Sequence, residues 1–206
     1  MSTPNATRRS QAKSDRRSLL LKAAERQFAE RGFLSVRLED IGAAANVSGP
    51  AIYRHFPNKE AMLVELLVGI STRLHNGGRA VVNQVETPEA ALTGLIDFHL
   101  DFALGEPDLI RIQDRDLSQL PAAALRQVRR SQRQYVEVWV HVLQQVHPGL
   151  AEADARLMAH AAFGLINSTP YSTKPVGANP TGSAPQSRAV LRAMTLAALR
   201  CAIDGS

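Results

Sequence analysis

Residues 36–63 read VRLEDIGAAANVSGPAIYRHFPNKEAML, and this stretch decides the fold. Its pattern predicts two short helices joined by a tight turn, followed at once by the start of a third helix. Leu38 and Ile41 give the first helix an apolar edge, and the small residues 42–45 allow another helix to approach closely. Turn formers at residues 46–49 then interrupt the helical pattern.

The second helix of the pair has clear start and stop signals. Ser48 is a good N-cap residue, because its hydroxyl can accept a hydrogen bond from an unpaired N–H of the next turn. Pro50 falls in the first turn, where its missing N–H costs nothing. Pro57 stops the helix, and Asn58 is placed to cap the helix that follows. A helix of about seven residues is not stable alone, so neighbouring helices must hold it.

The exposed face of this short helix follows from a rotation of about 100° per residue. Ile52 and Phe56 lie four residues apart and fix the buried side, so Arg54 points outward. An exposed Arg beside Lys59 suits a phosphate-lined groove with base edges at its floor. We expect DNA contacts from the outward face, its flanks and the adjoining turns: Arg37, Ser48, Gly49, Pro50, Ala51, Tyr53, Arg54, His55 and Lys59.

The segment from about Arg16 to Leu67 resembles the DNA-binding domain of TetR-family transcriptional regulators. The resemblance implies an all-α protein with an N-terminal three-helix helix-turn-helix DNA-binding domain and a larger helical effector-binding and dimerisation domain. The implied partner is a double-stranded DNA operator. The resemblance rests on these residues: Phe28, Gly32, Phe33, Ile41, Ala44, Val47, Ser48, Ile52, Tyr53, Arg54, His55, Phe56, Lys59 and Glu60.

Two residues depart from the family pattern. Arg37 stands where the family usually has Ser or Thr at the start of a helix. Arg is a poor N-cap residue, so we expect capping by the backbone or by Ser35, with Arg37 available for a phosphate contact. Gly49 occupies a position where the family often has a polar or charged residue that contacts DNA. Sequence discrimination therefore shifts toward Arg54 and the N-terminal arm.

The positive charge of the chain is concentrated near its N-terminus. Residues 1–60 hold 11 Lys and Arg against 6 acidic residues, and the remaining residues hold 13 of each. The net charge of +5 therefore lies on the segment that we expect to meet DNA. Residues 1–14 are polar and basic, and we expect a disordered arm there, either as a solvated tail or with an Arg inserted into a minor groove.

The composition also bears on the compartment. Cys201 is the only cysteine, which excludes an intramolecular disulfide and a zinc site built from cysteines. Its apolar neighbours predict a buried thiol. No apolar run approaches the roughly 20 residues that span a bilayer, and the polar N-terminus does not resemble a secretion signal. We therefore expect a cytoplasmic protein with no membrane partner.

We place the DNA-binding domain at residues 15–60 and the helical ligand-binding and dimerisation domain at residues 61–206. The first helix is expected over residues 15–31. A longer helix is expected over residues 58–76, where Gly77-Gly78 ends or kinks it. A short segment at 108–120 separates the further predicted helices, which cover residues 88–104, 121–147, 151–168 and 186–203.

The helix over residues 121–147 has a core-facing seam that steps alternately by three and four residues. Polar groups on this seam and on the stripe that carries His99 favour a lined cavity; the alternative is that Trp139 is simply a core residue. An acyl-CoA or fatty-acid-like effector suits the long apolar seam, and Arg111 or Arg115 is available for its carboxylate or phosphate. The candidate ligand pocket comprises His99, Phe102, Arg111, Arg115, Gln132, Tyr135, Trp139 and Phe163.

The last two helices are predicted to pair with a second copy of the chain. Residues 169–185, between them, contain four Pro and two Gly and are expected to be non-helical. Both helices are apolar over more than one face, which is typical of burial against a partner. In the resembling family such helices form a four-helix dimer interface. A homodimer would read a palindrome with recognition helices about 34–36 Å apart, or a multiple of it.

Two other classes of protein remain as alternatives. A small α-helical enzyme built on His99, Asp114 and Arg115 lacks a nucleophile motif and a Gly-rich phosphate loop. A constitutive regulator controlled by a protein partner would need a solid second domain. We therefore predict a repressor, without enzymatic activity, metal or cofactor, that a small apolar or acyl-type effector releases from its operator.

Overall fold

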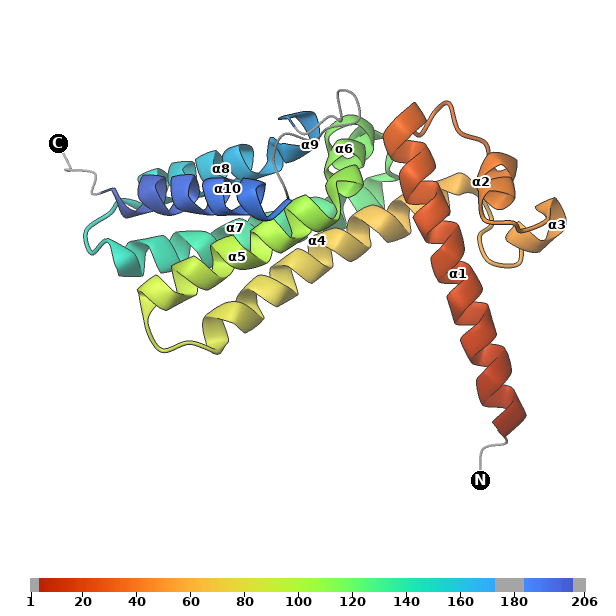
Figure 1. Ribbon diagram of the computed structural model, residues 1–206, viewed down its shortest axis with the longest axis horizontal. Coiled ribbons are helices and arrows are strands. Elements are labelled where there is room, and N and C mark those ends of the chain that lie inside the picture. Colours follow the sequence, from red (N-terminus) through yellow and green to blue (C-terminus); the bar gives the residue numbers. More distant parts are fainter. Residues whose placement is uncertain (1–3, 173–183, 202–206) are drawn as a thin grey trace. The chain divides into compact units, whose positions relative to one another are not determined.

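The computed structural model describes residues 4–172 and 184–201, and within these ranges the chain is α-helical, as predicted, with no strand. The chain forms two compact units (Figure 1). Unit 1 comprises Met1–Gly69 and Arg111–Leu125, and unit 2 comprises Ile70–Ile110 and Arg126–Ser206. None of the described helices combines the length and the apolarity needed to cross a membrane.

The units are discontinuous in sequence. Helix α4, Lys59–Asn83, contributes residues to both units, and so do α6, Pro107–Asp116, and α7, Ala122–Val146. The boundary that we placed at residue 60 therefore lies inside one helix, and residues 111–125, which we assigned to the second domain, pack in unit 1. Hydrophobic periodicity identifies a helix but does not show which of two cores each end of it joins.

Helix α1 spans Pro4–Arg31 and begins well before residue 15, where we expected it. Residues 4–14 are therefore helical, and the prediction of a disordered arm is wrong for them. This part contains good helix formers, no glycine, and proline only in the first turn. Gln11 Nε2 also donates a hydrogen bond to Asp15 Oδ1, one turn along, at 2.9 Å.

Helices α2, Leu38–Ala44, and α3, Gly49–Ile52, follow in unit 1. A Cβ atom at Gly42 would lie 2.9 Å from the carbonyl oxygen of Val47, so the two segments approach as closely as the small residues predicted. The N–H of Val47 donates to the carbonyl of Gly42 at 2.8 Å, and Asn46 turns the chain with a φ of 53°. Asn tolerates this left-handed conformation better than most residues.

Helix α4 continues through Gly77 and Gly78, which we expected to end or kink it. The reason lies in unit 2. A Cβ atom at Gly77 would lie 2.3 Å from Phe98 Cζ, and one at Gly78 would lie 2.5 Å from Tyr135 Cε2. These glycines leave room for two aromatic rings, so here glycine serves close packing inside a helix rather than its termination.

We expect Gly78→Ala to lower the free energy of unfolding by about 1–3 kcal/mol, because the added methyl group overlaps the ring of Tyr135. Gly69→Ala is the matched control on the same helix, since Gly69 is exposed and a Cβ there meets nothing within 4 Å. It should stabilise the protein by about 0.5–1 kcal/mol. Urea denaturation followed by circular dichroism measures both values, and equal effects would contradict the packing argument.

Unit 2 is a bundle in which α10 packs against α5 and α8, and α5 also packs against α8 (Figure 1). Thr87 caps α5, because its hydroxyl oxygen accepts a hydrogen bond from the N–H of Ala90 at 3.2 Å. The helices of unit 2 include α5 Pro88–Gly105, α8 Glu152–Asn167, α10 Ala184–Arg200 and α7 Ala122–Val146 from Arg126 onward. The remaining elements are a 3-10 helix, Leu117–Gln119, in unit 1 and α9, Thr169–Ser172, in unit 2.

Two predictions for the C-terminal part are wrong. The short helix α9 lies at the start of the segment that we expected to be non-helical, and its proline falls in the first turn, where a proline is tolerated. The rest of that segment, residues 173–183, lies outside the described residues. Cys201 is exposed, because it follows the end of α10, whereas the neighbouring Leu199 is buried.

Candidate nucleic-acid interface and effector site

Helix α3 is shorter than the seven residues that we predicted. Ser48 is its N-cap residue but makes no side-chain capping bond; its carbonyl accepts from the N–H groups of Ala51 and Ile52 at 2.9 and 3.1 Å. Beyond Ile52 the helix tightens, because the N–H of Arg54 donates to the carbonyl of Ala51. Arg54 therefore lies in the turn that follows α3.

Most of the side chains expected to contact DNA are accessible. No hydrogen bond or ion pair engages the guanidinium of Arg54 within the described part of the chain. A Cβ atom at Gly49 would meet nothing within 4 Å, so this position faces open space. Exposed positions are Arg37, Ser48, Pro50, Tyr53 and Arg54, and partly exposed ones are Gly49, Ala51, His55 and Lys59.

The starts of α2 and α4 each have a hydrogen bond between a backbone N–H and a side chain. Arg37 is the N-cap residue of α2 and its side chain makes no capping bond. Its own N–H donates to Asp40 Oδ2 at 3.1 Å, which is the reciprocal bond of a capping box. Asn58 Oδ1 accepts from the N–H of Ala61 at 2.8 Å, which confirms the predicted cap of α4.

Tyr53 links the two helices of the pair. Its hydroxyl donates to Glu39 Oε1 at 2.9 Å, although both side chains are exposed. This bond raises the pKa of Tyr53. The pKa of Glu39 is lowered, first by a backbone hydrogen bond and then by the Tyr53 hydroxyl. Tyr53 is therefore oriented by α2 before any DNA arrives.

A cluster of cations surrounds His55. Burial lowers the pKa of His55, and the charges of Lys13, Arg16, Arg17 and Arg54 lower it further. Lys13 and Arg16 lie on α1 and are exposed, so α1 adds positive charge beside the turn that carries Arg54. We did not predict DNA contacts from these two residues. Their spacing of about one helical turn, which places two basic side chains on one face of a helix, was the signal in the sequence.

Arg17 has a structural role in the same cluster. Its guanidinium lies 4.0 Å from the centre of the Phe56 ring and donates to the carbonyl oxygen of His55 at 2.5 Å. Arg17 Nε also donates to Glu65 Oε1 at 3.2 Å. Arg17 thus joins α1, the turn after α3 and the start of α4.

Lys59 does not have the free ammonium group that we expected for a phosphate contact. Its Nζ donates to the carbonyl oxygens of Phe33, Leu34 and Val36 at 2.7, 3.2 and 2.8 Å. It also lies 4.5 Å from the centre of the Phe33 ring. These contacts are formed by distant parts of the chain, so the position of Lys59 in a helical pattern gave no sign of them.

In unit 2, five of the predicted pocket residues form one cluster of rings, the aromatic cluster: His99, Phe102, Tyr135, Trp139 and Phe163. The Phe163 ring centre lies 4.9 Å from that of His99, 5.0 Å from that of Trp139 and 5.6 Å from that of Tyr135. His99 and Trp139 are 3% and 0% exposed, so the centre of the cluster is shielded from water.

The hydrogen bonds of His99 define its neutral form. Nε2 lies 3.1 Å from Asn167 Oδ1, an acceptor, and must carry the proton. Nδ1 lies 3.3 Å from the Tyr135 hydroxyl and therefore accepts from it. Burial lowers the pKa of His99 to about 4, partly offset by the bond to Asn167. Asn167 was absent from the predicted pocket, because it lies at the end of α8, outside the apolar pattern.

Two further buried groups lie in the aromatic cluster. Burial raises the pKa of Tyr135, and the Trp139 indole acts in the opposite direction. Trp139 Nε1 is buried and makes no well-formed hydrogen bond within the described part of the chain. A buried N–H that makes only a poor contact, here with the Tyr135 hydroxyl, costs free energy, so this donor is suited to a carbonyl oxygen supplied from outside.

The stability of the protein should fall in acid because of His99. Its folded-state pKa of about 4 lies below the ordinary 6.5. The free energy of unfolding therefore has its full value with respect to His99 above pH 6.5, and it decreases as the pH falls from 6.5 toward 4. The expected loss between pH 7 and 4 is about 3 kcal/mol. Urea denaturation of the parent and of His99→Gln over this range isolates it; parallel pH curves for the two proteins would contradict the burial of a neutral imidazole.

The other three predicted pocket residues do not join the cluster in the same way. Gln132 is partly buried on α7, three residues before Tyr135. Arg111 and Arg115 belong to unit 1, whereas the aromatic cluster belongs to unit 2. The guanidinium of Arg115 donates to carbonyl oxygens of α1. These bonds use the guanidinium that we expected to bind an effector carboxylate or phosphate.

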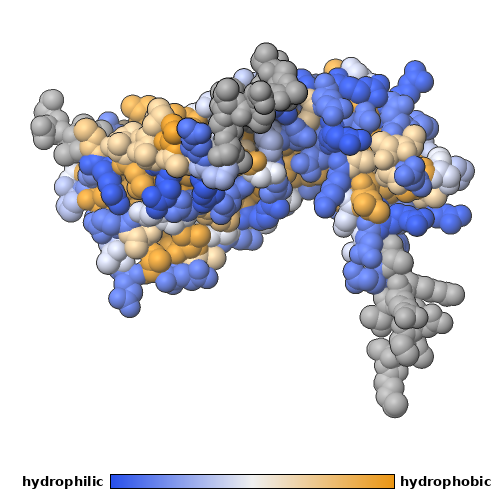
Figure 2. Space-filling view, in the orientation of Figure 1, coloured by the Kyte–Doolittle hydropathy of each residue, from blue (hydrophilic) through white to orange (hydrophobic). Residues whose placement is uncertain are grey.

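Helices α8 and α10 present an apolar surface, visible as an orange area over these two helices in Figure 2. Leu157, Val190 and Met194 are 68%, 51% and 51% exposed, although all are apolar. Between the helices lies a groove of about 260 Å³. It is lined by Met158, Ala161, Ala162, Leu165, Thr195, Ala198 and Leu199.

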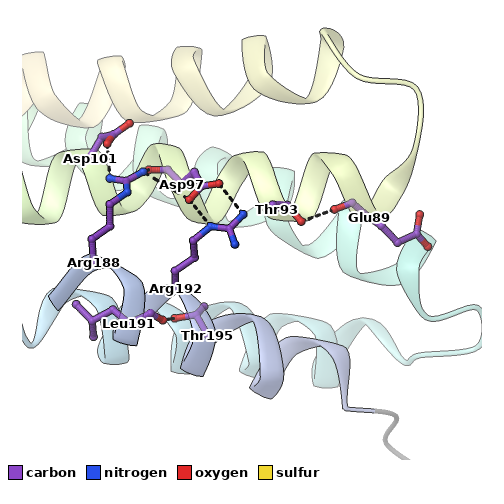
Figure 3. A network of polar contacts seen from close by, with 8 residues as sticks. All are labelled: Glu89, Thr93, Asp97, Asp101, Arg188, Leu191, Arg192 and Thr195. Carbon is purple, nitrogen blue, oxygen red and sulfur yellow. Dashed lines mark hydrogen bonds and ion pairs between the residues drawn. The ribbon is translucent and has the colours of Figure 1, made fainter. Parts of the chain in front are cut away.

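The opposite face of α10 is fixed to α5 by ion pairs (Figure 3). Arg192 donates to both carboxylate oxygens of Asp97, at 2.8 and 3.1 Å. Arg188 donates to Asp101 Oδ1 at 2.5 Å and also contacts Asp97. Because the arginines hold one side of α10, the apolar side that carries Met194 stays directed away from α5.

The fold and the exposed turn after α3 define a helix-turn-helix DNA-binding protein with a second helical domain. Residues 20–66 match the family model of bacterial regulatory proteins of the tetR family, and residues 85–177 match the tetracyclin repressor-like C-terminal domain. The chain belongs to the TetR family and is a DNA-binding transcriptional regulator, as its sequence predicted.

The chain is similar to named members of this family. The transcriptional repressor KstR2 of Rhodococcus jostii is 28% identical over 171 residues, which cover 82% of this chain and 83% of that protein. The structure of the ketosteroid transcriptional regulator KstR2 of Mycobacterium tuberculosis has a TM-score of 0.75 at 25% identity, covering 88% and 93% of the two chains. AibR, solved with isovaleryl coenzyme A and operator DNA, shares the fold with a TM-score of 0.69 at 18% identity, over 87% and 97%.

Proposed function

We propose that this protein is a homodimeric repressor that reads a palindromic operator through α3 and the turn after it, and that an effector bound in unit 2 releases it. The observation that carries the proposal is the accessible guanidinium of Arg54 together with the exposed cations Lys13 and Arg16, whose charges, like that of Arg54, act on His55. Arg suits a guanine edge, and the flanking cations suit phosphates. The similar protein KstR2 is named as a repressor, which supports the same direction of control.

The dimer is proposed through the groove between α8 and α10. Its lining is almost entirely apolar, and large apolar side chains stand exposed beside it. A surface of this kind gains free energy when a second copy covers it. A two-fold contact between the same helices of two chains would also relate the two DNA-binding units by two-fold symmetry, which matches the symmetry of a palindromic operator.

For the effector we propose an acyl-CoA thioester whose acyl part enters the aromatic cluster. The cluster holds a neutral imidazole and a buried indole N–H that makes no well-formed hydrogen bond, so it favours an uncharged carbonyl over a carboxylate. A thioester supplies such a carbonyl, whereas a free acid is charged at neutral pH. The complex of AibR with isovaleryl coenzyme A supports this chemical class for a protein of the same fold.

Selection of duplexes from a random DNA library with the purified protein tests the operator, and an enriched palindrome is expected. Acyl-CoA thioesters, free fatty acids and aromatic acids are then titrated against Trp139, the only tryptophan. Thioesters should change its fluorescence without DNA and weaken operator binding; a 100-fold weakening corresponds to about 2.7 kcal/mol of preference for the released state.

Two variants separate effector binding from DNA binding. Phe163→Ala, which removes one ring from the aromatic cluster, and Gln132→Trp, which adds a ring on α7 three residues before Tyr135, should alter the effector response more than the operator affinity. A palindrome without any fluorescence response across the panel would remove the effector half of the proposal. The protein would then be a constitutive regulator controlled by a protein partner.

A further inference from the structure

The turn between α1 and α2, residues 32–37, is held from two sides by residues far away in the sequence. Gly32 ends α1 with a φ of 84°, and its N–H donates to the carbonyl of Phe28 at 2.9 Å. Phe33 follows and is 7% exposed. The α1–α2 turn leads directly into α2, so its conformation sets where α2 begins.

Lys59 holds the carbonyl side of this turn. An ammonium group has three N–H donors, and the three carbonyl oxygens of Phe33, Leu34 and Val36 converge on Nζ. The ring of Phe33 lies against the same charge. No donor of Lys59 is left for a phosphate, and moving the side chain to DNA would leave three carbonyls without their donor.

Arg115 and Asp116 hold the other side. Asp116 Oδ2 accepts from the N–H of Phe33 at 3.2 Å, and Asp116 is 4% exposed. Arg115 pairs with Asp116 and donates to the carbonyl oxygens of Phe28 and, at 3.3 Å, of Ala29, at the C-terminal end of α1. The peptide groups of Phe33 are therefore fixed at both the N–H and the carbonyl oxygen.

The α1–α2 turn also determines the positions of α2 and α3. Two residues after Val36, α2 begins at Leu38. Helix α2 then carries α3 through the close approach at Gly42 and the bond between Glu39 and Tyr53. We propose that Lys59, Arg115 and Asp116 are positioning residues for operator reading: they fix this turn, and through it α2 and α3, and none of them contacts DNA. This inference rests on the proposed function.

Lys59→Arg and Lys59→Met test the role of Lys59 in the whole protein. A planar guanidinium cannot direct three N–H groups at three carbonyls around one point, so Lys59→Arg should weaken binding to the selected operator about tenfold, as should Lys59→Met. Binding to a scrambled duplex should change less than twofold, and the slope of log K against log salt should stay as in the parent protein.

A phosphate contact predicts the reverse. Lys59→Arg would then bind as tightly as the parent, and Lys59→Met would weaken both duplexes alike and flatten the slope by about two units per dimer. Either result overturns the inference while the proposed function stands. If the parent protein selects no duplex, the proposed function and this inference fall together.

Asp116→Ala should likewise weaken operator binding about tenfold, because the N–H of Phe33 loses its acceptor. Asp116→Asn should restore most of the affinity, since an amide oxygen still accepts, and Asp154→Ala, at an exposed position on α8, is the control. Hydrogen exchange without DNA should be faster at residues 32–37 in Lys59→Arg and Asp116→Ala than in the parent. Unchanged exchange in both variants overturns the positioning role, whatever their affinity for DNA.

Discussion

Replacing Ala198 with glutamate is expected to convert the proposed dimer into a monomer and to weaken operator binding at least 100-fold. Ala198 is exposed and lines the apolar groove between α8 and α10. In a two-fold contact the new carboxylate appears twice, and burying an unpaired charge costs several kcal/mol. A monomer can hold only one half-site, so the second set of contacts is lost with the interface. Light scattering and fluorescence anisotropy with the selected operator measure the two effects.

Ala153→Glu provides the matched control for this substitution. Ala153 is also exposed, but it lies in the first turn of α8 on the side away from the groove. An acidic residue at a helix N-terminus is favourable, so this variant should remain a dimer with parental affinity. A soluble monomer for the parent protein, or a dimer for Ala198→Glu, would show that the groove is not the interface.

The helix-turn-helix could be predicted from the sequence because its determinants are local. Asn46 and the residues after it break one helix and start the next, and Asn58 caps α4 as expected. Lys59, one residue further, could not be interpreted in the same way. Its partners are the carbonyls of residues 33, 34 and 36, and no periodicity shows that these carbonyls converge.

The aromatic cluster shows the same division between local and distant information. The seam on α7 correctly placed Tyr135 and Trp139 in the core, because a helical period identifies a buried face. Asn167, the partner of His99 Nε2, lies on another helix, and Arg115 belongs to the other unit. Polar contacts between helices depend on how the helices pack, and this packing cannot be deduced from the hydrophobic periodicity of any one helix.

The second large effect is expected from Arg54→Ala. Arg54 is exposed in the turn after α3, and its guanidinium has no partner within the described part of the chain, so its removal leaves the fold intact. A bidentate contact from Arg to a guanine discriminates against other bases by about 1–3 kcal/mol. Two half-sites double the loss for a dimer, so the operator affinity should fall at least tenfold. Preference at one base position in each half-site should also disappear.

Arg129→Ala separates this effect from a simple loss of charge. Arg129 is exposed on α7 in unit 2, and its removal changes the net charge by the same amount. Affinities are measured for operators in which each base pair is replaced in turn. Arg54→Ala should tolerate replacements at one position that the parent and Arg129→Ala reject. Equal weakening on the operator and on a scrambled duplex would mean that Arg54 contacts only phosphate, and that base reading lies with Tyr53, Ala51 or α1.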